Sequence, residues 1–141
     1  MSGVDRPVME QAVKEWCVPV LRHAGFKGSF PNFYRDTAGF VALLNFQFFS
    51  SGGSFCVNLA YADQGRSNIY FRPETPTQKL QVSQARERKR LGANQGDRWF
   101  SYGKTNYGEF RGEPADPMSI ATTINTLLES DAEVWWKSKI K

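Results

Sequence analysis

The sequence predicts an α+β fold, in which a mainly antiparallel sheet of about four or five strands carries N-terminal and C-terminal helices on one face. Two strand-like runs, 40–49 and 55–61, are rich in aromatic and β-branched residues and flank a turn-forming sequence at 50–53. Amphipathic helical patterns lie near both ends of the chain. A length of 141 residues is typical of one domain, which we expect to span 1–141.

The first helix is expected over 6–24, where apolar residues recur at steps of three and four. The resulting stripe comprises Met9, Ala12, Val13, Trp16, Cys17, Val20 and Leu21. Pro19 lies inside this pattern and predicts a kink or a split, because proline removes one helical hydrogen bond. Gly25 is expected to end the helix as a C-terminal cap, with Phe26 packing back on the last turn.

The central hairpin has a register that follows from its four-residue loop, which pairs Phe49 with Ser54. This register sets apolar pairs on one face, namely Phe48–Phe55, Phe46–Val57 and Leu44–Leu59. On the other face it sets Asn45 opposite Asn58 and Gln47 opposite Cys56. Both strands therefore agree on which face is core, and a slip of one residue would destroy that agreement.

Further strands are expected on both sides of the hairpin. A short strand over 30–35 precedes it, with 36–39 turning into the hairpin. After the hairpin, 68–72 and 98–102 are strand-like because they are rich in aromatic residues.

The segments 62–78 and 103–115 are expected to be flexible loops, since both are rich in residues that favour turns. Between them, 78–91 contains good helix formers without a clean apolar stripe, so its secondary structure stays open. A second helix begins at Asp116-Pro117, an N-cap followed by proline at the first helical position. One side of this helix is apolar except for Asp131 and comprises Ile120, Ile124, Leu127, Leu128, Asp131 and Trp135. A break in the helix is expected near Ser130.

The composition excludes disorder for most of the chain and predicts no membrane-spanning segment. Hydrophobic residues make up 40% and the net charge is +4, so burial can offset the entropy of ordering. The longest apolar run, 40–49, is interrupted by Asn45 and Gln47 and is too short for a bilayer. Residues 1–11 include Asp5 and Glu10 and lack the apolar core of a signal peptide. We therefore predict a cytoplasmic protein without a membrane partner.

Motifs for catalysis, metals and cofactors are not found, and we predict no catalytic residue, no metal ligand set and no cofactor. The one histidine, His23, follows Cys17 by six residues, which places the two on different sides of a helix. Cys17 and Cys56 lack a C-x-x-C spacing and are interpreted as packed thiols. The alternative is an enzyme with an unrecognised carboxylate site, although no clustering is evident for Asp63, Glu74 and Asp97.

The polar face of the hairpin is the first candidate site, with Asn45, Gln47 and Asn58 as candidate binding residues. Asparagine is depleted in strands, so this face needs an explanation. The amides either hydrogen-bond to one another and to a covering segment, or line a shallow groove that receives a partner's polar groups. An Asn58→Leu substitution separates the two, because only a buried network would lose much of the melting temperature.

The charged run 86–90 is the second candidate site. On a strand, Arg86, Arg88 and Arg90 would line one face and could meet phosphates or an acidic protein surface. The alternative is a solvated charged edge that discourages aggregation between sheet edges.

A series of short motifs occurs in a fixed order along the chain. They are Gly25-Phe26, Phe33-Tyr34-Arg35, Asn45-Phe46-Gln47, Phe55-Cys56-Val57-Asn58-Leu59, Arg90-Leu91-Gly92 and Trp99-Phe100. This order, over about 10–105, resembles the small and mostly bacterial family catalogued as domain of unknown function 4304. Trp99-Phe100 departs from the expected Trp-Trp pair, and 63–85 has no counterpart. The resemblance implies a fold and no reaction.

These observations together predict a non-catalytic module that binds another protein. Its most concrete version is an immunity-type protein that neutralises a bacterial toxin, by analogy with other small domains of this size and class. The first alternative is a nucleic-acid-binding protein that uses the basic ladder at 86–90.

Overall fold

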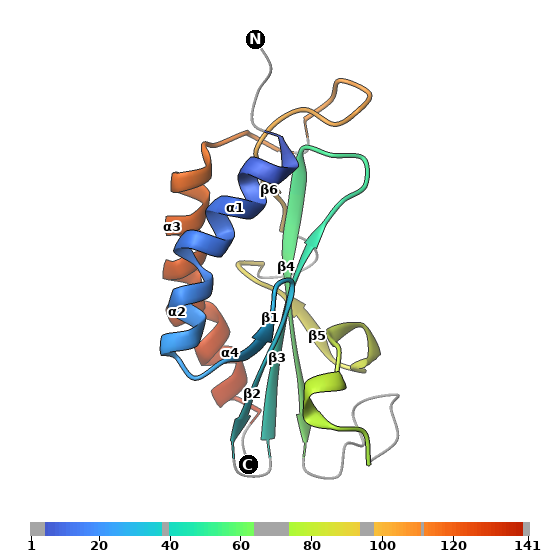
Figure 1. Cartoon of the computed structure of the whole chain (residues 1–141), viewed down its shortest axis with the longest axis vertical. Helices are drawn as coiled ribbons and strands as arrows, with labels where there is room; N and C mark the ends of the chain where they lie inside the picture. Colours follow the sequence, from blue (N-terminus) through green and yellow to red (C-terminus); the bar gives the residue numbers. More distant parts are fainter. Residues whose placement is uncertain (1–4, 38–39, 64–73, 94–97, 111, 140–141) are drawn as a thin grey trace.

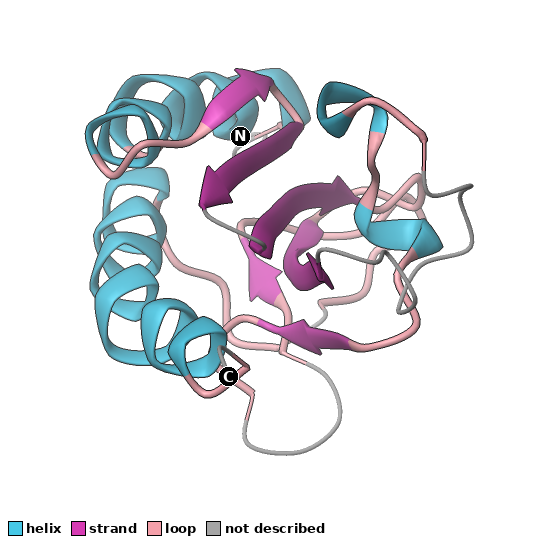
Figure 2. Ribbon diagram, turned by 90° about the horizontal axis from the view of Figure 1, so that it is seen from below, coloured by secondary structure: helices cyan, strands magenta, loops and turns pink. Residues whose placement is uncertain are grey.

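A computed structural model of the chain describes residues 5–37, 40–63, 74–93, 98–110 and 112–139. An antiparallel sheet lies between a layer of helices on one side and short 3₁₀ turns on the other (Figures 1 and 2). The helices come from the N-terminal and C-terminal parts of the chain and cover the same face. The predicted α+β class and its helix placement are therefore confirmed.

The sheet is built in the order β1-β2-β3-β4-β5, and β6 pairs with the first two residues of β4. The strands span Lys27–Ser29, Asn32–Thr37, Phe40–Phe48, Ser54–Asp63, Arg88–Arg90 and Phe100–Ser101. Every pairing is antiparallel. The hairpin of β3 and β4 has the predicted register on both faces, including Phe46 opposite Val57 and Asn45 opposite Asn58.

The first helix is split as Pro19 predicts, into α1 (Arg6–Trp16) and α2 (Val18–His23). Phe26 N donates to Leu21 O and Gly25 N donates to Arg22 O, which closes the helix in a Schellman motif with Gly25 at φ 96°. The buried stripe is narrower than expected. It contains Met9, Val13, Cys17 and Leu21, whereas Trp16 and Val20 are 48% and 37% exposed. The buried residues recur at every fourth position, on the side of the helix that faces the core, and Trp16 and Val20 lie outside this side.

The C-terminal helix begins as predicted, with the Asp116 carboxylate accepting from Ser119 N. α3 (Pro117–Leu127) passes through a π-helical turn, η3 (Leu128–Ala132), into α4 (Glu133–Lys137). The predicted break at Ser130 is this turn, which widens the helix locally without ending it. The widening keeps residues at intervals of four on the inner face, so Trp136 is buried and Trp135 only packs beside the core.

The weaker expectations differ from the structure in two segments. The strand expected over 30–35 lies at 32–37 as β2, and a further strand, β1, precedes it. The stretch 78–91, whose secondary structure was left open, contains two 3₁₀ turns, η1 (Thr77–Lys79) and η2 (Val82–Gln84), followed by β5. The strand-like run 98–102 contributes only β6. The run 68–72 lies outside the described residues.

The loop segments are held by backbone contacts where they are described. Tyr102 N and Gly103 N donate to Gly53 O, and Asn106 N donates to Ser51 O, which ties the start of 103–115 to the hairpin turn. Of the other predicted loop, 62–78, residues Ala62 and Asp63 belong to β4.

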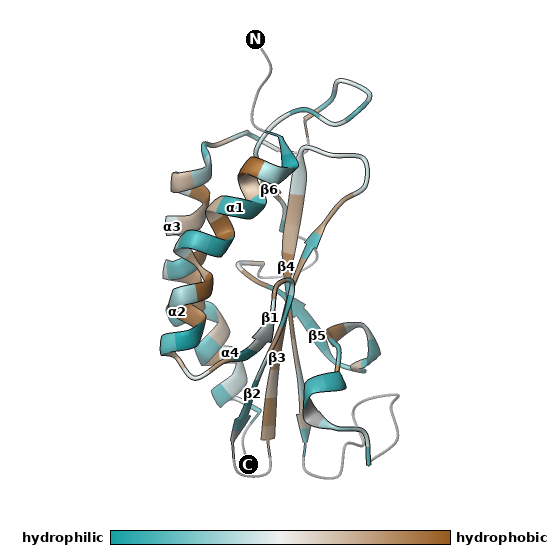
Figure 3. Cartoon of the chain, in the orientation of Figure 1, coloured by the Kyte–Doolittle hydropathy of each residue, from teal (hydrophilic) through white to brown (hydrophobic). Residues whose placement is uncertain are grey.

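Each face of the sheet carries its own apolar cluster. The larger one joins Phe46, Phe55, Leu59 and their neighbours to α1, α2, α3 and α4. The smaller cluster lies on the opposite face. Here residues 77–85, which contain η1 and η2 and which we call the 3₁₀ segment, place Leu80, Val82 and Ala85 over Val41, Leu43, Ala60 and Ala62. Figure 3 shows β3 and β4 as largely apolar and β5 as hydrophilic. Within the described ranges, no helix has the length and apolarity that crossing a membrane requires.

Candidate functional site

Four amide side chains form a hydrogen-bonded row across three strands of the sheet. Asn58 Nδ2 on β4 donates to Asn45 Oδ1 and to Gln47 Oε1 on β3, both at 3.0 Å. Asn45 Nδ2 then donates to Asn32 Oδ1 on β2, also at 3.0 Å. We call Asn32, Asn45, Gln47 and Asn58 the amide row. The row exists because the registers pair Asn32 with Asn45 and Asn45 with Asn58, while Gln47 lies two residues from Asn45 on the same face of β3.

The amide row lies beside the part of this face that the 3₁₀ segment covers. Val41 and Leu43 lie further along the same face of β3 and are buried under the smaller apolar cluster. Asn45 and Asn58 are half-buried, while Gln47 and Asn32 are exposed. The amides thus bond to one another, and Asn32 and Gln47 are exposed to solvent. That this face receives a partner's polar groups stays a prediction.

Two arginines of the charged run lie on the same face as the amide row. β5 pairs Arg90 with Asn58 and Arg88 with Ala60, so these side chains continue the row onto a fourth strand. Arg90 Nη1 donates to Cys56 Sγ, and the Arg90 guanidinium lies 5.7 Å from the centre of the Trp99 ring. Arg88 is exposed. The two candidate sites drawn separately from the sequence are therefore one surface.

The predicted three-arginine ladder is shorter in the structure. β5 begins at Arg88, and Arg86 lies in the bend that precedes the strand. We call the amide row together with Arg88, Arg90 and Trp99 the amide face.

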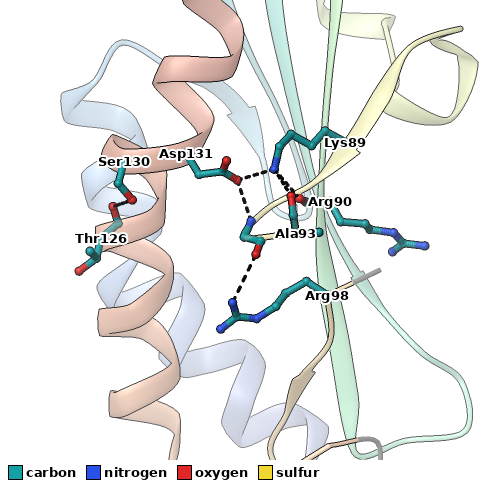
Figure 4. A network of polar contacts seen from close by, with 8 residues as sticks. Lys89, Arg90, Ala93, Arg98, Thr126, Ser130 and Asp131 are labelled. Atoms are coloured by element: carbon teal, nitrogen blue, oxygen red, sulfur yellow. Dashed lines mark hydrogen bonds and ion pairs between the residues drawn. The ribbon is translucent and has the colours of Figure 1, made fainter. Parts of the chain in front are cut away.

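The remaining charges of the run bind the sheet to the helices (Figure 4). Lys89 Nζ donates to Asp131 Oδ2 in η3 at 2.7 Å, and also to the backbone oxygens of Arg90 and Ala93. The same carboxylate oxygen accepts from Gly92 N at 2.7 Å. Asp131, the polar exception on the helical stripe, thus fixes the turn after β5 to the helix layer.

Glu87 is also engaged on the helix side of the sheet. Its carboxylate accepts from Lys139 Nζ and from Tyr61 Oη. Hydrogen bonds from these two groups lower the pKa of Glu87. Lys89 and Glu87 therefore bind within the protein on the side of the sheet away from the amide row.

A groove of about 330 Å³ adjoins the amide row at the β2 end. Its polar lining includes Asn32, Tyr34, Gln78 and Gln81, and Leu80 lies among them. Asn32 therefore belongs both to the row and to the groove. Sequence reasoning missed Asn32 and the two glutamines, because the pairing of β2 and the path of the 3₁₀ segment had no local signal.

The residues weighed for catalysis lie apart from one another. Cys17 is buried at the junction of α1 and α2, with Sγ 3.7 Å from Ala121 O, and burial raises the pKa of its thiol to about 12. His23 lines a separate pocket of about 320 Å³ between α2 and the C-terminal helices, beside Glu129 and Glu133. Asp97 lies outside the described residues. In the part of the chain that is described, no three His, Cys, Asp or Glu side chains gather as a metal site would require.

A family model described as "Domain of unknown function (DUF4304)" matches residues 17–138, which is most of the chain. This confirms the resemblance drawn from the order of motifs. No curated protein and no solved structure matches the chain.

Proposed function

The chain belongs to the DUF4304 family, and we propose that it is a non-catalytic module that binds another protein through the amide face. The observation that supports this proposal is the amide row itself. Four hydrogen-bonding side chains lie in the middle of the sheet beside a buried apolar cluster, and Asn32 and Gln47, at the two ends of the hydrogen-bonded chain, are exposed.

The amide row is organised before any partner arrives. Its side chains are fixed by mutual hydrogen bonds and stand on paired strands, so little conformational entropy is lost when they bind. The row also has an aromatic neighbour, Trp99, whose ring lies 4.0 Å from that of Phe49. Aromatic and arginine side chains are the residue types that dominate binding energy at protein interfaces.

The narrower form of the proposal is neutralisation of a toxin in the bacterial cytoplasm. A small module that covers a toxin's active surface needs one rigid, specific face, and the amide face meets that requirement. In this form the partner arrests growth when it is produced alone, and growth resumes when this chain is produced with it.

Nucleic-acid binding is the second candidate, because Arg88 and Arg90 share their face with Trp99. Arginine contacts to phosphates and stacking on aromatic rings would supply its affinity. The structure favours the protein partner, since Lys89 is bound to Asp131 and the amide row lacks the regular charge that follows a phosphate backbone.

Photocrosslinking in the native host tests this function. A benzophenone amino acid at exposed Gln47 should crosslink to one discrete protein, whereas the same amino acid at exposed Thr122 on α3 should not. Crosslinks from Gln47 to nucleic acid would instead support nucleic-acid binding, the second candidate function. Equal crosslinking at both positions, or none at Gln47, would contradict a binding role for the amide face.

A further inference from the structure

We propose that the amide face binds an extended segment of the partner through main-chain carbonyl groups and at least one carboxylate. This inference rests on the proposed function, because it names the chemistry that the same surface recognises. It follows from the donors at the outer residues of the row, the charges beside it and the distance across the amide face.

The two outer residues of the amide row present N–H donors. A primary amide has two N–H donors and an oxygen with two lone pairs that accept. The Asn32 oxygen accepts from Asn45 and the Gln47 oxygen accepts from Asn58. The internal bonds among the described residues therefore use oxygens at both outer positions, and the amino groups of Asn32 and Gln47 keep their donors for a partner.

The charged side chains on this face also favour a partner that carries hydrogen-bond acceptors. Arg88 and Arg90 continue the row on β5. Among the residues of β2–β5 that the registers place on this face, the acidic one is Asp36, which lies opposite Val41 at the far end. A segment rich in oxygen acceptors and carrying a carboxylate fits this combination of amide donors and guanidinium groups.

The distance across the amide face fits a short extended segment. Neighbouring strands lie about 4.8 Å apart, so crossing the amide face from Asn32 on β2 to Arg90 on β5 covers about 14 Å. An extended chain advances about 3.3 Å per residue, so four or five residues span this distance. At the β2 end, the groove beside Asn32 and Tyr34 can take a side chain of that segment.

Selection from random peptides of about eight residues, displayed on phage and presented to the full-length protein, tests the inference. Selected peptides should be enriched in Asp or Glu and should bind as synthetic peptides. Two isosteric variants, Asn32→Asp and Gln47→Glu, keep the oxygens that accept within the row but replace the outward amino groups by acceptors. Each should weaken binding by roughly tenfold, the effect of one lost charge-assisted hydrogen bond.

The matched control is Gln11→Glu, the same change at an exposed position on α1. It should leave peptide affinity unchanged, which separates a local effect from the added negative charge. Thermal unfolding of each variant confirms that the fold is retained.

Three results would overturn the inference: peptides without acidic enrichment, peptides whose affinity is equal in all variants, or selection of no peptide. Binding of single-stranded DNA or RNA that is lost in the same variants would also overturn it. None of the first three affects the crosslink from Gln47, so failure of this inference is distinguishable from failure of the proposed function.

Discussion

Asn58 donates to two amides of β3 at once, and this double contact holds the amide row together. Its side chain is only half-buried, so water can reach the groups that a substitution would release. The row is therefore a hydrogen-bonded network in contact with solvent. Breaking it should change the free energy of unfolding less than breaking a network buried in a core.

Replacing Asn58 by leucine is expected to leave the fold intact and to lower the free energy of unfolding by about 1 kcal/mol, because water replaces the lost partners. Urea unfolding measures this change, with Thr123→Leu at an exposed position of α3 as the control. A loss of about 3 kcal/mol or more would show that the row is a buried structural network.

Asp131 is the residue on which the docking of β5 to the helices depends. Its carboxylate accepts from both Lys89 and Gly92, and the two charged side chains are 20% and 25% exposed. Asp131→Asn should lower the free energy of unfolding by about 2 kcal/mol, the cost of losing charge-assisted hydrogen bonds.

A double-mutant cycle with Lys89→Met isolates the Lys89–Asp131 contact. The two substitutions should be less than additive, because removing either partner already breaks the ion pair. Additive losses would show that Asp131 acts through Gly92 alone.

At the scale of elements, the turn between β3 and β4 is packed against the segment that follows β6. Gly53 has a φ of 80°, and a Cβ built there would lie 2.6 Å from Gly103 O and 2.7 Å from Lys104 C. Gly108 has a similar φ of 83°, but a Cβ there meets nothing within 4 Å. Substitutions at Gly53 and Gly108 therefore separate the cost of a left-handed backbone conformation from the cost of a clash with neighbouring backbone atoms.

Gly108→Ala should cost about 1 kcal/mol, the usual penalty of a left-handed conformation for a residue with a Cβ. Gly53→Ala should cost clearly more, about 3 kcal/mol, because backbone atoms must also move. Thermal unfolding of both variants measures the difference. Equal losses would mean that the segment after β6 adapts freely to the hairpin turn.

The junction of α1 and α2 carries a pH-dependent contribution to stability at Cys17. Burial raises the pKa of its thiol from 9.0 to about 12 in the folded protein. The folded state therefore retains the proton where the unfolded state loses it. The contribution is fully present below about pH 9 and is lost as the pH rises from there toward 12.

Urea unfolding of the wild type and of Cys17→Ala between about pH 8 and 10.5 measures this contribution. Above about pH 9, the difference in free energy of unfolding should change by about 1.4 kcal/mol per pH unit, in the direction that weakens the wild type. Parallel curves for the two proteins would contradict the assignment to Cys17.

The sequence predicted elements best where pattern and turn chemistry agree. The hairpin of β3 and β4 was placed in register because its loop length and both face patterns allow one pairing. The split at Pro19 and the cap at Asp116 follow from backbone chemistry that acts locally. The residues of 78–91 were not resolved by pattern, because packing on the second sheet face decides their 3₁₀ turns.

The candidate site was predicted in part for the same reason. Asn45, Gln47 and Asn58 belong to the hairpin, so their common face could be derived. Arg90 lies beside Asn58 because β4 pairs with β5, and these two strands are distant in sequence. Asn32 joins the row through the pairing of β2 with β3, and a local pattern does not carry that register.

At the scale of the whole molecule, the two faces of the sheet have different partners. Helices from both ends of the chain bury one face, and the 3₁₀ segment covers part of the other (Figures 1 and 2). The amide face lies beside that partial cover, on a sheet whose other face is packed against the helix layer. We expect a partner to complete the second face where the 3₁₀ segment ends.

Native mass spectrometry of the tagged protein purified from its host tests this account most directly, with the ratio of absorbance at 260 and 280 nm recorded alongside. The account predicts that the 16.0 kDa chain carries the mass of a second polypeptide, at a low ratio. This mass should be lost in the Asn32→Asp/Gln47→Glu double variant and kept in Gln11→Glu. A second polypeptide retained in the double variant, a chain without added mass across several growth states, or added mass with strong 260 nm absorbance would contradict it.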